Sequence, residues 1–420
     1  MDSISNVVFY IATFFSVYLQ VFLLITFLEN RKKIVVNTLH LELEKYPGVT
    51  VVVPCYNEEK TIFRTVHSLL ELDYPKDKLH LILIDDGSTD DTFSILKRFE
   101  GRNNIKVIKK ENGGKHTAQN LGLKYTETPF VGCLDSDSLV HPQALKRIMN
   151  TFSKDESVSA VIPSILVTSS KNIVEKVQKA EYDLIVFNKK MFSFLNAIHV
   201  TPGPFAIFKK KVFDEIGPYR HAHNTEDQEI ALRMHKHGYK IENCSDAYVY
   251  TSVPKTISRL YQQRVRWTYG FFRNMIDYRD LFFKKKFGNL GFLTLPSGII
   301  SFSGVIVMFV LLVANFVSFI SKKILEIKTI GMSASFGIFK FDFFFINTKT
   351  LLFMTIFTYI LLIIAIFIGK KMTEGKPGFP FEVLYLVPFY GFFAPFWIIR
   401  SFWNAIFKKE SSWQMERVSL

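Results

Sequence analysis

The apolar positions of the chain are gathered into long runs near its two ends. Val7 to Leu28 carries no charge, and at about 1.5 Å per residue a helix of that length extends roughly 33 Å, enough to cross the hydrocarbon core of a bilayer. Ile299 to Ile320 and Leu351 to Gly369 are two further uncharged runs of spanning length. The pattern therefore predicts membrane-spanning helices at both ends of the chain.

Three apolar segments admit more than one interpretation. For the first run a secretory signal peptide is the alternative, but Asp2 precedes the run and basic residues 31–33 follow it, which favours a span. Val383 to Trp403 is interrupted by prolines, so a kinked span, a hairpin and an interfacial segment all stay open. The alternation from Phe336 to Phe345 indicates either an interfacial amphipathic stretch or a strand.

The residues between the first and second runs alternate between strand and helix patterns. Short β-branched or apolar runs end at polar turns at 49–53, 79–84, 105–108 and 130–134. Helical periodicity separates them at about 61–72, 92–99 and 117–125. Such alternation predicts an α/β fold with a mostly parallel sheet, whose ligands bind beyond the carboxyl ends of the strands.

The charge of the chain fits a membrane protein better than a nucleic-acid-binding protein. The formal net charge is +14, which alone would favour binding to phosphate backbones. The basic clusters lie beside the apolar runs, at 31–33, 284–286, 370–371 and 408–409, as the positive-inside rule predicts for cytoplasmic flanks. We therefore expect an integral protein of the cell membrane, with a cytoplasmic middle region and no nucleic-acid partner.

Polar residues after the predicted strands are mostly acidic. Glu58 follows the first strand, Asp85 and Asp86 follow the second, and Asp135 and Asp137 follow the fourth. Carboxylates at three strand ends would repel one another in one crevice unless a cation or a hydrogen-bonding ligand compensates them. The sequence contains neither GxGxxG nor GxxxxGK[ST], which argues against a dinucleotide fold and a P-loop ATPase. We therefore predict a site for a metal ion and a ligand of another kind.

Cysteine contributes nothing to this metal prediction. The three cysteines are far apart and form no CxxC pair, which excludes a disulfide scaffold and a cysteine-based zinc site. A reducing compartment fits this use of cysteine best.

At these residues the sequence resembles glycosyltransferase family 2, and specifically its membrane-embedded branch of cellulose, chitin, hyaluronan and poly-N-acetylglucosamine synthases. The resemblance runs from about residue 49 to 273. Its motifs, in chain order, are Val53-Pro54-Cys55-Tyr56-Asn57-Glu58, Asp85-Asp86-Gly87-Ser88, Gly113-Gly114-Lys115, Asp135-Ser136-Asp137, Thr225-Glu226-Asp227 and Gln263-Arg264-Val265-Arg266-Trp267. The resemblance implies a GT-A fold, a nucleotide-diphosphate sugar donor, usually of UDP, and Mg²⁺ or Mn²⁺ as cofactor.

The resemblance also assigns roles on the donor side. Asp137 is the expected metal ligand, and Asp135 is expected to contact the metal or the ribose, because divalent cations that bridge a diphosphate take oxygen ligands. Asp86, with Asp85 as the alternative, is expected to accept a hydrogen bond from the uracil. The remaining donor-binding residues implied by the motifs are Pro54, Tyr56 and Glu58 in the first nucleoside-binding loop and Lys115 near the phosphates.

On the acceptor side, Asp227 is the candidate general base. It would take the proton of the acceptor hydroxyl as that oxygen attacks the anomeric carbon, so that the linkage is inverted. Gln263 and Arg266 are expected to face the pyrophosphate, and Trp267 to stack on the acceptor sugar. Residues 256–283 are amphipathic and are expected to lie in the membrane interface.

The whole chain is interpreted as a membrane-bound enzyme with a cytosolic catalytic domain. The predicted parts are an N-terminal span (1–30), a cytosolic GT-A domain (45–255), interface helices (256–286), a C-terminal membrane region (287–407) and a tail (408–420). The predicted function is inverting, metal-dependent transfer of GlcNAc or Glc from a UDP-sugar to a growing β-linked polysaccharide, with coupled export. The alternatives are single addition to a membrane lipid, as in ceramide glucosyltransferases, and an inactive transport or scaffold protein. The expected partners are the donor, a carbohydrate acceptor, the lipid bilayer, and an accessory subunit or a second copy.

Overall fold

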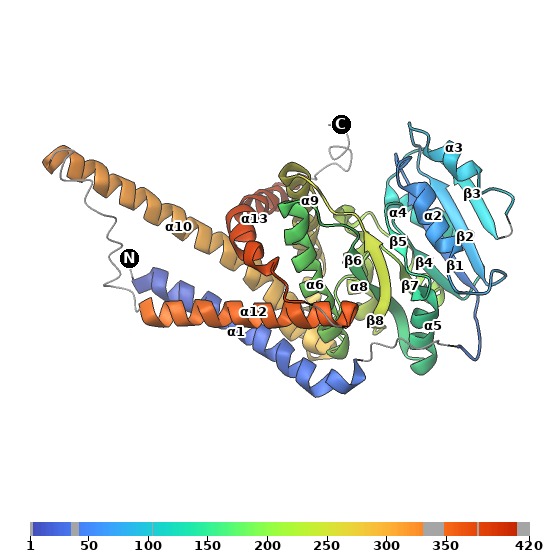
Figure 1. The fold of residues 1–420 in the computed structure, drawn as a ribbon, viewed down its shortest axis with the longest axis horizontal. Helices are drawn as coiled ribbons and strands as arrows, with labels where there is room; N and C mark the ends of the chain where they lie inside the picture. The colour runs from blue at the N-terminus through green and yellow to red at the C-terminus, as the bar shows by residue number, and fades with distance from the viewer. Residues whose placement is uncertain (1–2, 35–41, 103, 331–347, 376–377, 410–420) are drawn as a thin grey trace.

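The computed structural model describes residues 3–34, 42–102, 104–330, 348–375 and 378–409. Within them, an α/β region at one end is joined to a set of long helices at the other (Figure 1). The expected alternation at Phe336 to Phe345 and most of the expected tail lie outside the described residues.

The described residues form one mixed sheet of eight strands in the order β3-β2-β1-β4-β7-β6-β8-β5. The strands are β1 Val49–Cys55, β2 Leu79–Asp85, β3 Ile105–Lys109, β4 Phe130–Cys133, β5 Leu139–Val140, β6 Val158–Val167, β7 Ala206–Lys209 and β8 Lys240–Thr251. The pairs among β3, β2, β1 and β4 are parallel, as is the pair of β6 with β8. Strand β7 runs antiparallel to both β4 and β6, and β5 runs antiparallel to β8.

Helices cover both faces of this sheet. They are α2 Ile62–Leu70, α3 Thr92–Lys97, α4 Lys115–Lys124, α5 Ala144–Lys154, α7 Lys211–Ile216 and α8 Glu226–Lys236. One apolar core joins α2, α3 and α5 to the odd-numbered residues of β1, and a second joins α4, α7 and α8 to Val52 of the same strand. The alternation follows from the two-residue period of a strand, which sends successive side chains to opposite faces.

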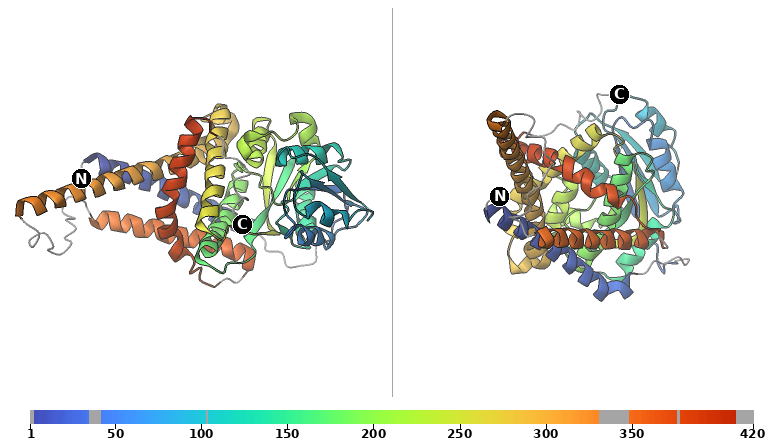
Figure 2. Two further views of the ribbon diagram at one scale, coloured as in Figure 1. Left: turned by 90° about the horizontal axis from the view of Figure 1, so that it is seen from above. Right: turned by 60° about the vertical axis from the view of Figure 1, so that its left-hand side comes forward.

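Four long helices are apolar enough to cross a membrane, judged by length and composition among the described residues. They are α1 Ser3–Asn30, α10 Leu295–Ile330, α12 Thr348–Glu374 and α13 Val383–Ile406. Figures 1 and 2 show α1, α10 and α12 extending away from the sheet. The segment from Val383 to Trp403, for which a kinked span, a hairpin and an interfacial segment were all considered, lies within one continuous helix, α13. This helix contains Pro388 and Pro395.

The four helices α1, α10, α12 and α13 are called the membrane-type helices below. Two further helices, α6 Ile173–Phe194 and α9 Ile257–Asp277, lie between them and the sheet (Figure 1). A capping box begins α6, because Asn172 accepts a hydrogen bond from the backbone of Glu175 while the Glu175 carboxylate accepts one from Asn172. The two helices pack against α13, and the hydroxyl of Ser401 in α13 donates to the carbonyl of Val265 in α9 at 3.0 Å. Helix α9 thus links the sheet region to the C-terminal helices.

The three cysteines, Cys55, Cys133 and Cys244, are all buried and unpaired. Burial raises the pKa of the Cys133 thiol to about 12, and it raises the pKa of the Cys244 thiol to the same value. These thiols act as small apolar side chains in the core. The expectation that the fold contains no disulfide scaffold agrees with this arrangement.

The close approach of α4 to β1 yields a testable consequence for stability. A Cβ atom at Gly122 would stand 2.4 Å from Cγ1 of the buried Val52. We expect Gly122→Ala to lower the free energy of unfolding by about 1–3 kcal/mol, because the overpacked side chain cannot be accommodated without moving the helix. The measurement is the thermal unfolding midpoint in detergent. The double variant with Val52→Ala should unfold at a higher temperature than Gly122→Ala, and an unchanged midpoint for Gly122→Ala would refute the packing argument.

Candidate active site

The ends of three neighbouring strands bring the predicted acidic residues to one edge of the sheet. In the parallel register Cys55 of β1 lies opposite Asp85 of β2, and Val52 of β1 lies opposite Cys133 of β4. The residues that follow each strand, at 56–58, 86–88 and 135–137, therefore leave the sheet at the same edge. This is the edge at which open α/β sheets bind ligands.

Pro54 is the last residue but one of β1. The loop that follows the strand is hydrogen-bonded to the loop after β2 and to the start of α3. Asn57 has a φ of 54°, in the left-handed region that asparagine tolerates, and its backbone N–H donates to Ser88 Oγ at 3.0 Å. The N–H of Glu58 donates to Thr92 Oγ1 at 2.7 Å. The carboxylate of Glu58 accepts a hydrogen bond from Thr61 Oγ1 at 2.6 Å. Glu58 and its neighbour Tyr56 are half-buried.

Asp85, the last residue of β2, and Asp86, which follows it, have different surroundings. The Asp86 carboxylate accepts hydrogen bonds from the backbone N–H of Gly113 at 3.1 Å and of Gly114 at 2.9 Å, and it pairs with Lys110. Asp85 is fully buried, and its Oδ2 atom has no hydrogen-bond partner. Asp86 therefore holds the glycine loop in place, whereas Asp85 has an oxygen available for a further hydrogen bond.

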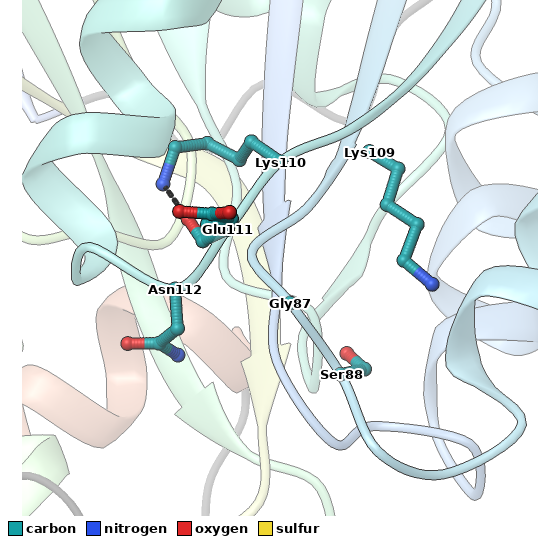
Figure 3. A pocket seen from close by; sticks show the side chains of 6 residues that line it. All are labelled: Gly87, Ser88, Lys109, Lys110, Glu111 and Asn112. Atoms are coloured by element: carbon teal, nitrogen blue, oxygen red, sulfur yellow. Dashed lines mark hydrogen bonds between the residues drawn. The ribbon is translucent and has the colours of Figure 1, made fainter.

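A pocket of about 610 Å³ opens beside these loops, lined by Gly87, Ser88, Lys109, Lys110, Glu111 and Asn112. Figure 3 shows Lys109 and Lys110 pointing to opposite sides of the chain, with Lys110 bonded to the carbonyl of Glu111. Gly87 has a φ of 77°, and a Cβ atom there would stand 2.7 Å from the backbone nitrogen of Asn112. Only glycine fits at this approach of the two loops.

Lys115 joins three elements of the site through ion pairs. It begins α4, and its Nζ lies 2.6 Å from Asp135 Oδ1, after β4, and 3.1 Å from Glu226 Oε1, at the start of α8. Burial by itself lowers the pKa of Lys115, but the two carboxylates outweigh it and raise the pKa well above the ordinary lysine value. A Cβ atom at Gly203 would stand 2.5 Å from this Nζ and 2.7 Å from the Asp135 carboxylate.

Asp137 lies in a crowded acidic environment next to this network. Burial raises its pKa to about 7, and the charges of Asp135 and Glu58 add to the shift. The hydroxyl of Ser138 donates to Asp137 Oδ1 at 3.2 Å. A carboxyl group in this position gains from any cation placed beside it.

Asp227 stands in the first turn of α8. Its pKa is raised to about 6, first by burial and then by the neighbouring charge of Glu226. The backbone carbonyl of Asp227 accepts hydrogen bonds from the N–H and Oγ1 of Thr201 at 3.0 and 2.9 Å. These bonds fix the backbone of Asp227, and the N–H of Gln228 donates to its Oδ1 at 2.9 Å. A carboxylate with a pKa raised towards neutrality has the properties of a general base.

Helix α9 presents its motif residues in different directions. Arg266 Nη1 donates to the carbonyl of Asn224, just before α8, at 3.4 Å. Burial raises the pKa of Glu226, but the charge of Lys115 and, more weakly, that of Arg266 outweigh it and lower the pKa. The Oε1 atom of Gln263 is buried without a partner. Trp267 instead lines a separate cavity of about 270 Å³, together with Glu181, Arg264, Thr268, Phe302, Tyr390, Ala394, Trp397 and Ile398.

This second cavity lies where α9 meets α6, α10 and α13. The guanidinium of Arg264 stacks over the Trp267 ring at 4.6 Å from the centroid and pairs with Glu181 at 2.6 Å. The hydroxyl of Tyr390, from α13, also donates to the Glu181 carboxylate. The cavity is thus walled by aromatic rings with a charged pair at one side, and it borders the membrane-type helices.

The described residues contain no group of three or more His, Cys, Asp or Glu side chains arranged as metal ligands. Asp135 and Asp137 supply two carboxylates within an acidic cluster that raises the pKa of Asp137 to about 7. Mg²⁺ is commonly held by one or two carboxylates, with substrate phosphates and water completing its shell. The residues present fit a cation that arrives with a diphosphate.

The structure therefore brings some predicted residues together and separates others. Asp135, Lys115 and Asp227 lie in one electrostatic cluster with Asp137 nearby, whereas Trp267 faces the second cavity. Sequence reasoning assigned no role to Lys110, Glu226 or Gly203. Glu226 stood inside a recognised motif, but Lys110 resembled a solvated lysine at a strand end.

Comparison with known proteins finds similarity to glycosyltransferases, the class of protein that the motifs of this site resemble. Residues 50–217 match the profile of the family described as "Glycosyl transferase family 2". This match confirms the resemblance inferred from the motifs. It ends before α8 and α9, so the segments that carry Asp227 and Arg266 lie beyond it.

Two relatives are poly-beta-1,6-N-acetyl-D-glucosamine synthases of staphylococci. The chain is 32% identical to that of Staphylococcus epidermidis over 231 residues, which are 54% of this chain and 56% of the relative. It is 32% identical to that of Staphylococcus aureus (strain COL) over 232 residues, or 55% of this chain and 56% of the relative. The chain spans little more than half the length of these relatives.

A solved structure extends the comparison to the whole fold. The mannosyltransferase PcManGT from Pyrobaculum calidifontis, in complex with GDP-Man and Mn²⁺, aligns with 95% of this chain and 100% of its own, at a TM-score of 0.56 and 17% sequence identity. At that identity the likeness establishes the fold alone. The predicted GT-A type of α/β fold, with a mostly parallel sheet and helices at both ends, is confirmed.

Proposed function

We propose that this protein is a membrane-bound, inverting glycosyltransferase that transfers a sugar from a UDP-sugar to a growing β-linked polysaccharide. The observation that carries the proposal is the meeting of Asp135, Glu226 and Lys115, with Asp137 and Asp227 beside them, at the ligand-binding edge of a GT-A sheet. The relatives named as poly-beta-1,6-N-acetyl-D-glucosamine synthases support GlcNAc as the sugar.

The donor would lie across the ends of β1, β2 and β4. Tyr56 and Glu58 would hold the nucleoside, and Asp85 or Asp86 would accept a hydrogen bond from the base. The unpartnered Oδ2 of Asp85 favours Asp85 as the acceptor, with Asp86 acting through the glycine loop that it fixes. Lys115 would exchange part of its contact with Asp135 for the diphosphate.

Asp137 and Asp135 would hold Mg²⁺ or Mn²⁺. The ion supplies charge neutralisation for the departing nucleoside diphosphate. Its charge would also keep the Asp137 carboxyl ionised, because it offsets the burial and the like charges that raise the pKa of this group. The chain itself would place the two carboxylate ligands at the edge of the sheet. Because residue 203 is glycine, no side chain at that position displaces Lys115 or the Asp135 carboxylate.

Asp227 would accept the proton of the acceptor hydroxyl as that oxygen attacks the anomeric carbon. The bond from the anomeric carbon to the diphosphate oxygen breaks on the opposite side, so an α-linked donor yields a β-glycoside. Arg266 would approach the leaving diphosphate from α9, since its charge already acts on Glu226 within the site. Gln263 would contact the diphosphate through the N–H groups of its side-chain amide.

Trp267 would provide the platform for the acceptor sugar in the cavity that borders α13. Four membrane-type helices and the positive flanks support a membrane protein whose catalytic part, 45–255, faces the cytoplasm. We further propose that 256–286 acts as the interface region and that the helices within 287–407 accompany the product towards the membrane. An accessory subunit or a second copy would complete a passage for polymer.

The decisive experiment offers the purified protein in lipid a panel of labelled UDP-sugars with Mg²⁺ or Mn²⁺. We expect one donor, UDP-GlcNAc first, to yield a high-mass polymer that a linkage-specific glycosidase digests. Asp227→Asn should abolish transfer and leave UDP binding intact, because it removes the base and keeps the shape of the side chain. A single-sugar glycolipid would replace the polymer proposal, and full turnover by Asp227→Asn would exclude Asp227 as the base.

The pH profile should report the same base. Because the pKa of Asp227 is raised to about 6, the carboxyl group is protonated and inactive below that pH. We expect kcat/KM to fall by about tenfold per pH unit below 6. Glu226→Gln should move this limb to lower pH, since it removes a neighbouring negative charge. A limb that stays in place in Glu226→Gln would contradict the assignment.

Metal dependence gives a separate prediction. Excess EDTA should stop transfer, and Mn²⁺ or Mg²⁺ added above the chelator should restore it. Asp137→Asn should lose the cation-dependent part of UDP affinity, measured by calorimetry with and without Mn²⁺. Undiminished transfer in EDTA would remove the metal from the mechanism.

A further inference from the structure

Three consecutive residues immediately before the Thr225-Glu226-Asp227 motif have left-handed backbones. The φ angles of Ala222, His223 and Asn224 are 45°, 57° and 62°. None of the three is glycine, and a left-handed conformation is unfavourable for alanine, although asparagine and histidine tolerate it better. Such a run persists only where the surrounding structure holds it, and strained backbone of this kind gathers at functional sites.

One face of α9 holds this segment, defined here as the 222–224 loop, together with Thr225, which follows it. Arg266 Nη1 donates to the carbonyl of Asn224 at 3.4 Å. One turn further on, Gly270 lies against Thr225 so closely that a Cβ atom would stand 2.3 Å from its side chain. A turn beyond that, Asn274 Nδ2 donates to Thr225 Oγ1 at 2.9 Å. The spacing of four residues places these contacts on one face of the helix.

The loop residue His223 is fixed by a second row of α9. Its Nε2 lies 2.8 Å from Asp277 Oδ2, and its ring meets Tyr269 edge-on at a centroid distance of 6.2 Å. The His223 side chain is 19% exposed and that of Asp277 is 45% exposed, so the pair is closed on one side and reachable from solvent on the other. It joins the last residue of α9 to the loop that precedes Asp227.

We propose that His223 and Asp277 form a latch that holds the 222–224 loop in its left-handed conformation and so positions Asp227 for proton transfer. Both are positioning residues, because they act through the loop and not on the substrate. This inference rests on the proposed function, in which Asp227 is the base. It adds that the far end of α9, about three turns beyond Arg266, helps to set the geometry of the base.

The first test compares His223→Ala with His223→Gln in the full-length protein in lipid. His223→Ala loses the contact with Asp277, whereas the amide of Gln can still donate to it. We expect His223→Ala to lower kcat by about 10-fold to 100-fold, as small misplacements of reacting groups do, with KM for the UDP-sugar changed less than about twofold. His223→Gln should recover most of the lost kcat, and Asp277→Ala should reproduce the defect.

Asp280→Ala provides the matched control. It breaks the ion pair between Lys236 Nζ and Asp280 Oδ2, at 2.7 Å, which also links the α8 helix to the chain just after α9 but does not involve the loop. We expect this variant to retain wild-type kcat. An equal loss in Asp280→Ala, or wild-type kcat in His223→Ala, would overturn the latch.

Two readouts separate the latch from the proposed function. Backbone amide exchange over 221–228 should be at least about tenfold faster in His223→Ala than in the wild type or Asp280→Ala, whatever the reaction. Unchanged exchange would refute the latch. Wild-type activity of Asp227→Asn, with the exchange difference retained, would refute the base and leave the latch as a structural element.

Discussion

The site depends on the ammonium group of Lys115, whose side chain is half-buried. It pairs with Asp135 after β4 and with Glu226 at the start of α8, so one charge ties together three elements that are far apart in the sequence. Without it, carboxylates converging from several elements would face one another in a partly dry crevice. Burial, and after it the like charges of the neighbouring carboxylates, still raises the pKa values of Asp137 and Asp227. Both carboxyl groups therefore gain from a cation placed beside them or from a proton taken from an acceptor hydroxyl.

The first half of the sheet could be predicted from local pattern because each of its strands is a compact apolar run followed by a polar turn. The predicted strands at 49–53, 79–84, 105–108 and 130–134 correspond to β1, β2, β3 and β4, and their parallel pairing follows from the intervening helices. The positions of the acidic residues follow in turn, since parallel strands end at one edge. For this reason the motif residues of the donor side could be named from sequence, although their individual roles stay predictions.

The second half could not be predicted, because its contacts join residues that no local period connects. Strand β5 has two residues, and β7 reverses the direction of the sheet between β4 and β6. The direction in which each side chain of α9 points could not be predicted either. Arg266 and Trp267 are adjacent in the chain, yet Arg266 reaches the loop before α8 and Trp267 lines the cavity beside α13. The unpartnered oxygen of Asp85 and the close approach of Gly203 to Lys115 likewise arise only when distant segments meet.

The burial of all three thiols has a consequence for chemical labelling. Cys55, Cys133 and Cys244 have little exposed surface, and burial keeps each as a protonated thiol that reacts slowly with maleimides and thiosulfonates. The native chain is therefore a quiet background for such reagents. A single cysteine introduced at an exposed position of any helix would be the dominant reactive thiol without further substitution. Reagents that do not cross the bilayer could then determine which ends of α1, α10, α12 and α13 face each side of the membrane.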